Sequence, residues 1–170
     1  AEAIVITASG CAPMVRDYGK ALADDADYAG KAARISELAL DISTVIDAEP
    51  LADCLARDAG GQSIAFHSPC TLQHGQGITG VVERLLQSAG YVLQPVTDSH
   101  LCCGSAGTYS ILQPELSAQL RDNKLGALQA GEPAAIATAN IGCLAHMSAH
   151  AEVPVRHWIE LLEPLLPEAR

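Results

Sequence analysis

Four of the six cysteines stand in loops that follow short apolar runs, each of which predicts a β-strand: Cys70, Cys102, Cys103 and Cys143. In a parallel sheet the carboxyl ends of the strands lie at one edge, so loops at that edge bring distant thiols together. Thiolates gathered in this way bind metal ions or clusters, or take part in disulfide exchange. The placement of these cysteines therefore predicts a metal centre or a redox site.

Glycine and histidine residues accompany these thiols. Gly104 follows the cysteine pair and lets the backbone approach a bulky inorganic group, to which its N–H can bond. His146 stands three residues after Cys143 at the start of an expected helix, so both side chains can reach one point. His67 precedes the Ser-Pro-Cys turn and is expected to cap or orient it. Three further ligand candidates are close in sequence: Cys11, His74 and His100.

The rest of the chain alternates apolar runs with amphipathic stretches, which predicts an α/β fold with a parallel sheet and flanking helices. Strands are expected over residues 3–8, 63–66, 91–96 and 134–139, with an edge strand at 153–155. The first of these is expected to be buried. Helices are expected over residues 31–47, 51–57, 77–89, 114–130 and 157–165. Cys54 is expected to pack in the core.

Two strings of the sequence are alike. AIVITASGC, residues 3–11, and AIATANIGC, residues 135–143, are both apolar runs that end in a small residue, Gly and Cys. The similarity predicts an internal duplication whose first copy is truncated at its N-terminus. We expect residues 1–60 to be the remnant of a first repeat with a helical linker, and residues 61–170 to be a complete second repeat. The opening strand also predicts that the chain is a fragment.

Composition limits the function. Among 170 residues, 49% are apolar and only 4% aromatic, so the core is built from Ala, Leu, Ile and Val. The net charge of −10 argues against binding to nucleic acid. No apolar run is long enough for a transmembrane helix, and the first residues lack the basic start of a signal peptide. Reduced thiols fit the cytoplasm, which is the expected location, with membrane association only through a larger complex.

The spacing Cys-x31-Cys-Cys-x39-Cys-x2-His resembles the cysteine-rich CCG domain of heterodisulfide reductases, lactate utilisation proteins and glycolate oxidases. Longer strings resemble iron–sulfur subunits of glycolate oxidase: HSPCTLQHGQ, DSHLCCGSAGTYSILQPELS, LRDNKL, ANIGCLAH and PVRHWIELL. TASGCAPMVRDY resembles the end of a first CCG repeat in those proteins. The fold that this resemblance implies is a pair of Rossmann-like half repeats.

The resemblance implies an iron–sulfur cluster of the 4Fe-4S type, held by the four thiols named above with Gly104 beside them. His146 stands where the family has its last cysteine. The cluster would pass electrons from a flavin-containing subunit that oxidises glycolate or D-lactate towards a quinone or other acceptor. The 2-hydroxy acid would react on the flavin subunit, so this chain alone is not expected to be catalytic.

Other interpretations of the same residues remain open. A structural zinc ion would take four sulfurs, or three sulfurs and His146. A metal-free dithiol site would exchange disulfides. A fragment without any metal would serve as a docking domain for the other subunits of the complex.

Overall fold

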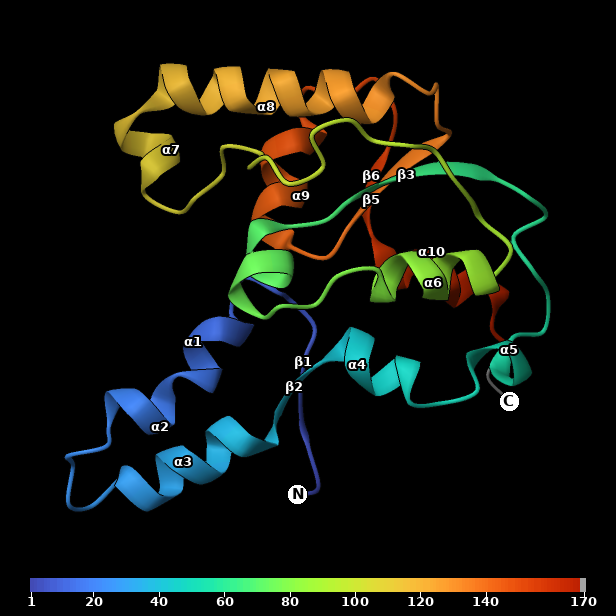
Figure 1. Cartoon of the computed structure of the whole chain (residues 1–170). Helices are drawn as coiled ribbons and strands as arrows, with labels where there is room; N and C mark the ends of the chain where they lie inside the picture. The colour runs from blue at the N-terminus through green and yellow to red at the C-terminus, as the bar shows by residue number, and fades with distance from the viewer. Residues whose placement is uncertain (169–170) are drawn as a thin grey trace.

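The computed structural model describes residues 1–168 and contains two parallel sheets flanked by helices (Figure 1), as predicted. The larger sheet has the strand order β4-β3-β5-β6, and the smaller one pairs β1 with β2. The strands are β1 (Ile4–Ile6), β2 (Ala39–Asp41), β3 (Ser63–His67), β4 (Val92–Leu93), β5 (Ala135–Thr138) and β6 (Val155–His157). Every pair is parallel, so the carboxyl ends of β3 and β5 meet at one edge.

Helices cover both faces of the larger sheet. On one face lie α6 (Val81–Ser88) and α10 (Trp158–Leu162), and on the other lie α8 (Pro114–Gln129) and α9 (Ile141–Ser148) (Figure 1). Neighbouring strand residues point to opposite faces. Ile64 and Phe66 therefore pack with Trp158 in one core, while Ala65 packs with Met147 in the other. The thiols of Cys103 and Cys143 belong to this second core.

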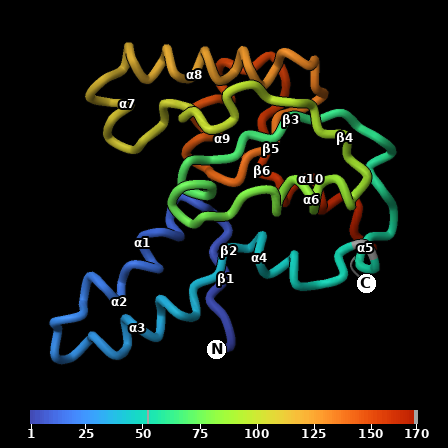
Figure 2. Tube along the Cα trace, viewed as in Figure 1, coloured from blue at the N-terminus to red at the C-terminus, as the bar shows by residue number. Residues whose placement is uncertain are grey.

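The remaining helices range from three to ten residues in length. The first three project away from the larger sheet (Figure 2): α1 (Ala12–Arg16), α2 (Tyr18–Ala21) and α3 (Ala29–Leu38). Four others lie between strands: α4 (Ile42–Asp47), α5 (Leu51–Cys54), the π-helix η1 (Thr71–Gly75) and α7 (Tyr109–Leu112). The 3-10 helix η2 (Glu163–Leu165) follows α10 after the last strand. Within residues 1–168, no helix has the length and apolar character needed to cross a membrane.

The prediction of a single helix over residues 31–47 is wrong. Its apolar periodicity continues, but the backbone becomes extended at Ala39 and pairs in parallel with Ile4. Asp41 ends that strand and starts α4, since its carboxylate accepts the Ser43 amide at 3.0 Å and the Ser43 hydroxyl at 2.7 Å. Strand pairing and a side-chain cap thus override the helical pattern.

Other expectations need smaller corrections. The first strand is short and Val5 is 46% exposed, because β2 is its only partner among the described residues. The strand expected over 91–96 shrinks to Val92–Leu93. The helix expected from residue 77 begins at Val81, because Gly80 has a φ of 74° that a helix does not allow. Cys54 is exposed rather than packed in the core.

The likeness between residues 3–11 and 135–143 continues in three dimensions. Each strand leads into a short helix, with Cys11 at the N-cap of α1 and Cys143 in the first turn of α9. Each then pairs in parallel with a strand that runs directly into a helix, β2 into α4 and β6 into α10. Asp41 and His157 cap those helices from the same position.

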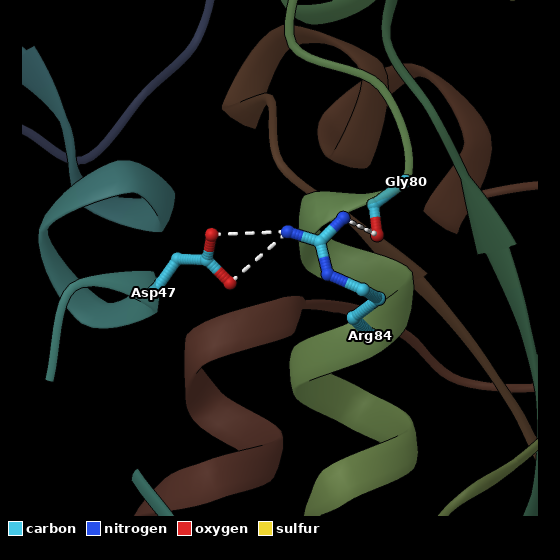
Figure 3. A network of polar contacts seen from close by, with 3 residues as sticks. All are labelled: Asp47, Gly80 and Arg84. Atoms are coloured by element: carbon cyan, nitrogen blue, oxygen red, sulfur yellow. Dashed lines mark hydrogen bonds and ion pairs between the residues drawn. The ribbon is translucent and has the colours of Figure 1, made fainter. Parts of the chain in front are cut away.

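One ion pair joins this N-terminal part to the second half. Arg84 of α6 donates from one nitrogen to both carboxylate oxygens of Asp47, at 3.0 and 3.2 Å, and from another to the Gly80 carbonyl at 3.2 Å (Figure 3). Both side chains remain partly exposed, so the pair contributes little stability and acts mainly to orient α4 against α6.

Candidate metal centre

The four thiols expected to converge lie in one continuous row. The pKa of Cys102 responds to the thiols of Cys103 and Cys70, and the pKa of Cys103 responds to the thiols of Cys102 and Cys143, so these groups are neighbours. The sulfurs of Cys103 and Cys143 lie within 4.8 Å of each other. Cys103 and Cys143 are buried, and Cys70 and Cys102 are half-buried. All six cysteines are free, so none of these sulfurs is consumed by a disulfide.

Local structure positions the thiols and supplies one of them with a backbone donor. Cys70 is the N-cap of η1, and Cys143 lies just beyond Asn140, whose Oδ1 accepts the amides of Gly142 at 2.8 Å and Cys143 at 3.4 Å. The Gly104 amide donates to the sulfur of Cys102 at 3.3 Å. The backbone near Thr71 and Ser105 acts to lower the pKa values of Cys70 and Cys103, against the larger effects that raise them. An N–H group such as that of Gly104 stabilises negative charge on a metal-bound thiolate.

An imidazole that the sequence did not assign as a ligand lies in this centre. A ring nitrogen of His67 and the sulfurs of Cys103 and Cys143 all lie within 4.8 Å of one another. His67 is 1% exposed, and its Nδ1 lies 2.9 Å from the Thr138 hydroxyl. The position of His67 at the end of β3, three residues before Cys70, is the signal that could have found it.

The other sequence candidates lie elsewhere. His146 is half-buried, and its Nε2 lies 3.2 Å from the Ser117 hydroxyl, which donates to the Gly104 carbonyl at 2.9 Å. It is not a member of the buried group formed by His67, Cys103 and Cys143. The remaining three candidates are exposed: Cys11, His74 and His100.

Gly104 has two roles. Its amide donates a hydrogen bond to the Cys102 thiol. Its φ of 87° is one that other residues rarely adopt. A Cβ at this position would collide with the Ser117 carbonyl of α8. The glycine is therefore required by the close packing of the cysteine loop on α8.

Lys124 is a second residue whose role the sequence did not reveal. It is 2% exposed, and its ammonium donates to the carbonyls of Asp98 at 3.0 Å and Ser99 at 2.9 Å. These bonds tie the loop before Cys102 to α8. Burial lowers the pKa of Lys124, an effect opposed first by Cys103 and then by Asp98. A buried cation beside thiols favours their ionised or metal-bound form.

Without metal, the thiols of Cys70, Cys102 and Cys103 hold their protons. Burial, and then the neighbouring Cys102 thiol, raise the pKa of Cys70. The hydrogen bond to Cys103, and then burial, raise the pKa of Cys102. For Cys103, a hydrogen bond with Cys102 lowers the pKa, but the hydrogen bond with Cys143 and burial outweigh it and bring the pKa to about 12. Burial, and then the charge of Lys124, lower the pKa of His67 to about 3, so the imidazole is neutral.

The donor set fits a sulfur-rich metal group. Four thiols lie in a row, and the Gly104 amide already donates to the sulfur of Cys102. Soft thiolate ligands of this kind favour iron–sulfur clusters and zinc over hard cations. At one end of the row, Cys70 and Cys102 are half-buried and lie near solvent. At the other end, Cys103 and Cys143 are buried.

Comparison with known proteins identifies relatives of this chain. The sequence model of the family described as "Cysteine-rich domain" (CCG) matches residues 64–148, which is half of the chain. This segment contains all four thiols of the row.

Individual relatives extend beyond that segment. The chain is 52% identical over 166 residues to the "Glycolate oxidase iron-sulfur subunit" of Escherichia coli, covering 98% of this chain and 40% of the relative. It is 29% identical over 147 residues to the "Probable glycolate oxidase iron-sulfur subunit" of Bacillus subtilis, covering 86% of this chain and 33% of the relative. It is 27% identical over 169 residues to "Lactate utilization protein A" of Anoxybacillus flavithermus, covering 95% and 70%. The chain thus spans less than half the length of the first two relatives.

Proposed function

We propose that this chain, which belongs to the CCG cysteine-rich domain family, binds an iron–sulfur cluster and transfers electrons as part of a larger oxidoreductase. The observation that carries this proposal is the row of four neighbouring thiols, in which the Gly104 amide donates to the sulfur of Cys102 at 3.3 Å. The proposed ligands are Cys70, Cys102, Cys103 and Cys143. His146 is retained as a further candidate ligand.

The cluster, proposed to be of the 4Fe-4S type, would supply the electron-accepting centre. The chain would supply thiolate ligands, an amide donor and burial from solvent at the end formed by Cys103 and Cys143. Burial and N–H donation to sulfur together set the reduction potential of such a centre. Lys124 supports this role, since its positive charge near the sulfurs offsets the negative charge of bound thiolates.

The names of the relatives suggest the complex in which this occurs. We propose that the parent protein receives electrons from a flavin-containing subunit that oxidises glycolate or D-lactate, and passes them to a quinone or another acceptor. This chain would not itself react with the 2-hydroxy acid. Free thiols favour a cytoplasmic location, with membrane association only through the complex.

We further propose that residues 1–60 are the end of a first CCG repeat with its linker, and residues 61–170 a second, complete repeat. Support comes from the common order of strand, cysteine-bearing turn, helix, parallel strand and capped helix in the two segments. Cys11 corresponds to Cys143 when the two similar strings of sequence are aligned, although Cys11 is the N-cap of α1 and Cys143 lies in the first turn of α9.

The decisive experiment is anaerobic analysis of iron, acid-labile sulfide and zinc in the purified chain after reconstitution. The wild type and Cys103→Ser are compared, with Cys54→Ser as a matched control because Cys54 is an exposed thiol on α5, outside the row. Iron and sulfide in equal amounts, lost in Cys103→Ser and kept in the control, support the proposal. Absence of iron and sulfide from the wild type would refute it for this chain.

A structural zinc site is the second candidate. The buried group of His67, Cys103 and Cys143 offers one nitrogen and two sulfurs within 4.8 Å, which suits tetrahedral zinc. In the same experiment, zinc without sulfide identifies this alternative. The chain would then serve as a scaffold or docking domain.

A further inference from the structure

We infer that His67 donates a hydrogen bond from its Nε2–H to the sulfurs of Cys103 and Cys143, and thereby raises the reduction potential of the cluster. In this role it is a positioning and tuning residue rather than a ligand. The effect on the potential rests on the proposed cluster, whereas the direction of the hydrogen bond can be tested without any metal.

The contacts of the ring identify which nitrogen faces the sulfurs. Nδ1 lies 2.9 Å from the Thr138 hydroxyl. A ring nitrogen of His67 also lies within 4.8 Å of the sulfurs of both Cys103 and Cys143. Because Nδ1 is already bonded to Thr138, Nε2 on the other side of the ring is the nitrogen available to those sulfurs.

The hydroxyl of Thr138 determines which ring nitrogen carries the proton. Thr138 is 0% exposed, and among residues 1–168 its hydroxyl has His67 Nδ1 as its one hydrogen-bond partner. A buried hydroxyl proton without an acceptor is costly, so the Thr138 hydroxyl donates and Nδ1 accepts. The neutral ring then holds its proton on Nε2, which makes Nε2 a donor towards the sulfurs.

The sheet holds this arrangement in place. His67 and Thr138 are direct partners in the parallel pairing of β3 with β5, at the centre of the four-stranded sheet. Neither backbone can shift without breaking that pairing. The donor is therefore in position before any metal arrives, and an N–H bonded to cluster sulfur favours the reduced, more negative state.

The competing arrangement makes His67 a metal ligand. Nε2 would then lack a proton, Nδ1–H would donate to Thr138, and the Thr138 proton would be left without an acceptor among the described residues. The two arrangements differ in the position of one proton and in whether nitrogen bonds to iron. Both differences are measurable.

The first test uses the reduced, metal-free chain. Long-range proton–nitrogen NMR of the 15N-labelled protein reports the tautomer of each histidine. We expect His67 as the Nε2–H form in the wild type, and a changed Nδ1 shift in Thr138→Val, which removes the hydroxyl but leaves the ring. An Nδ1–H form of His67 in the wild type would overturn the inference.

The second test uses the anaerobically reconstituted chain and compares His67→Leu with His67→Gln. Glutamine keeps an N–H at a similar reach, whereas leucine removes it. We expect both variants to keep iron and sulfide, the midpoint potential to fall in His67→Leu, and His67→Gln to stay near the wild type. His74→Gln is the control, since His74 is exposed. Circular dichroism and a thermal melt check that each variant is folded.

The outcomes separate the two proposals. A wild-type potential in folded His67→Leu would overturn the inference and leave the cluster proposal intact. So would iron-bound nitrogen-14 in pulsed EPR of the reduced wild type, accompanied by loss of iron in His67→Gln. If the wild type takes up no iron, the cluster proposal fails, and the NMR measurement alone decides the direction of the hydrogen bond. If His67→Leu does not fold, the NMR measurement and His67→Gln decide.

Discussion

The backbone amide of Ser9 donates to the carbonyl of Ala139 at 3.0 Å, which fixes the turn after β1 against the end of β5. A side-chain network reinforces this link. The Thr71 hydroxyl, one residue after Cys70, lies 3.1 Å from the Ser9 hydroxyl and accepts from Asn140 Nδ2 at 3.1 Å. The N-terminal segment therefore supports the loops that carry Cys70 and Cys143.

Thr71→Val tests this support, because it removes both side-chain hydrogen bonds while nearly keeping the shape. We expect the metal-free chain to lose about 1 kcal/mol of unfolding free energy per lost bond, measured by urea denaturation. The matched control is Thr79→Val at an exposed site, which should change stability little. Equal effects of the two substitutions would contradict the bridging role of Thr71.

Gly104→Ala tests the packing of the cysteine loop on α8. Gly107 provides a control, since its φ is also positive but a Cβ there meets nothing within 4 Å. Gly107→Ala should cost about 1–2 kcal/mol from left-handed strain alone. Gly104→Ala adds the collision with the Ser117 carbonyl, so this variant should lose more stability than Gly107→Ala. It should also take up less metal. Thermal melts compare the two variants, and similar losses would rule out the collision.

Lys124→Met tests whether the buried ammonium holds the loop before Cys102. The carbonyls of Asp98 and Ser99 each lose a charged donor, and hydrogen bonds to a charged group contribute about 1.5–3 kcal/mol. We expect alkylation of Cys102 and Cys103 in the metal-free chain to become roughly tenfold faster, which corresponds to about 1.4 kcal/mol of easier opening. Mass spectrometry identifies the modified thiols. Lys20→Met at an exposed position is the control, and an unchanged Cys102 rate in Lys124→Met would refute the role.

The buried neutral His67 predicts a pH dependence of stability. Burial, and then Lys124, lower its folded pKa to about 3, so at mildly acid pH the unfolded chain binds a proton that the folded chain does not. Stability should therefore decline as the pH falls from about 6.5 towards 3. Urea denaturation of the metal-free chain should show a smaller decline for His67→Gln. An identical pH profile for the variant and the wild type would contradict the assignment.

The convergence of the thiols could be predicted from sequence because it follows from topology. Once Cys70, Cys103 and Cys143 are placed after parallel strands, the common edge of the sheet brings them to the same side of the fold. The length of β2 and the start of α4 could not be predicted in this way. They depend on pairing with Ile4 and on the Asp41 cap, both of which compete with a continuous helical pattern.

Buried polar residues were missed for a different reason. Lys124 stands on a helix where a lysine normally reaches solvent, and only the fold shows that two loop carbonyls cover it. His67 ends a strand, and the direction of its ring depends on the pairing partner Thr138, which is 71 residues away. A linear pattern contains neither fact.

The raised pKa values of Cys70, Cys102 and Cys103 make filling of the centre an acid-releasing reaction. Each thiol that becomes a ligand releases its proton to the buffer. The apparent affinity of the chain for the metal should therefore rise tenfold per pH unit for every proton displaced. The same protonation keeps the empty centre a poor nucleophile at neutral pH, since thiolates are the reactive form. The metal-free chain would therefore resist oxidation at these three sulfurs.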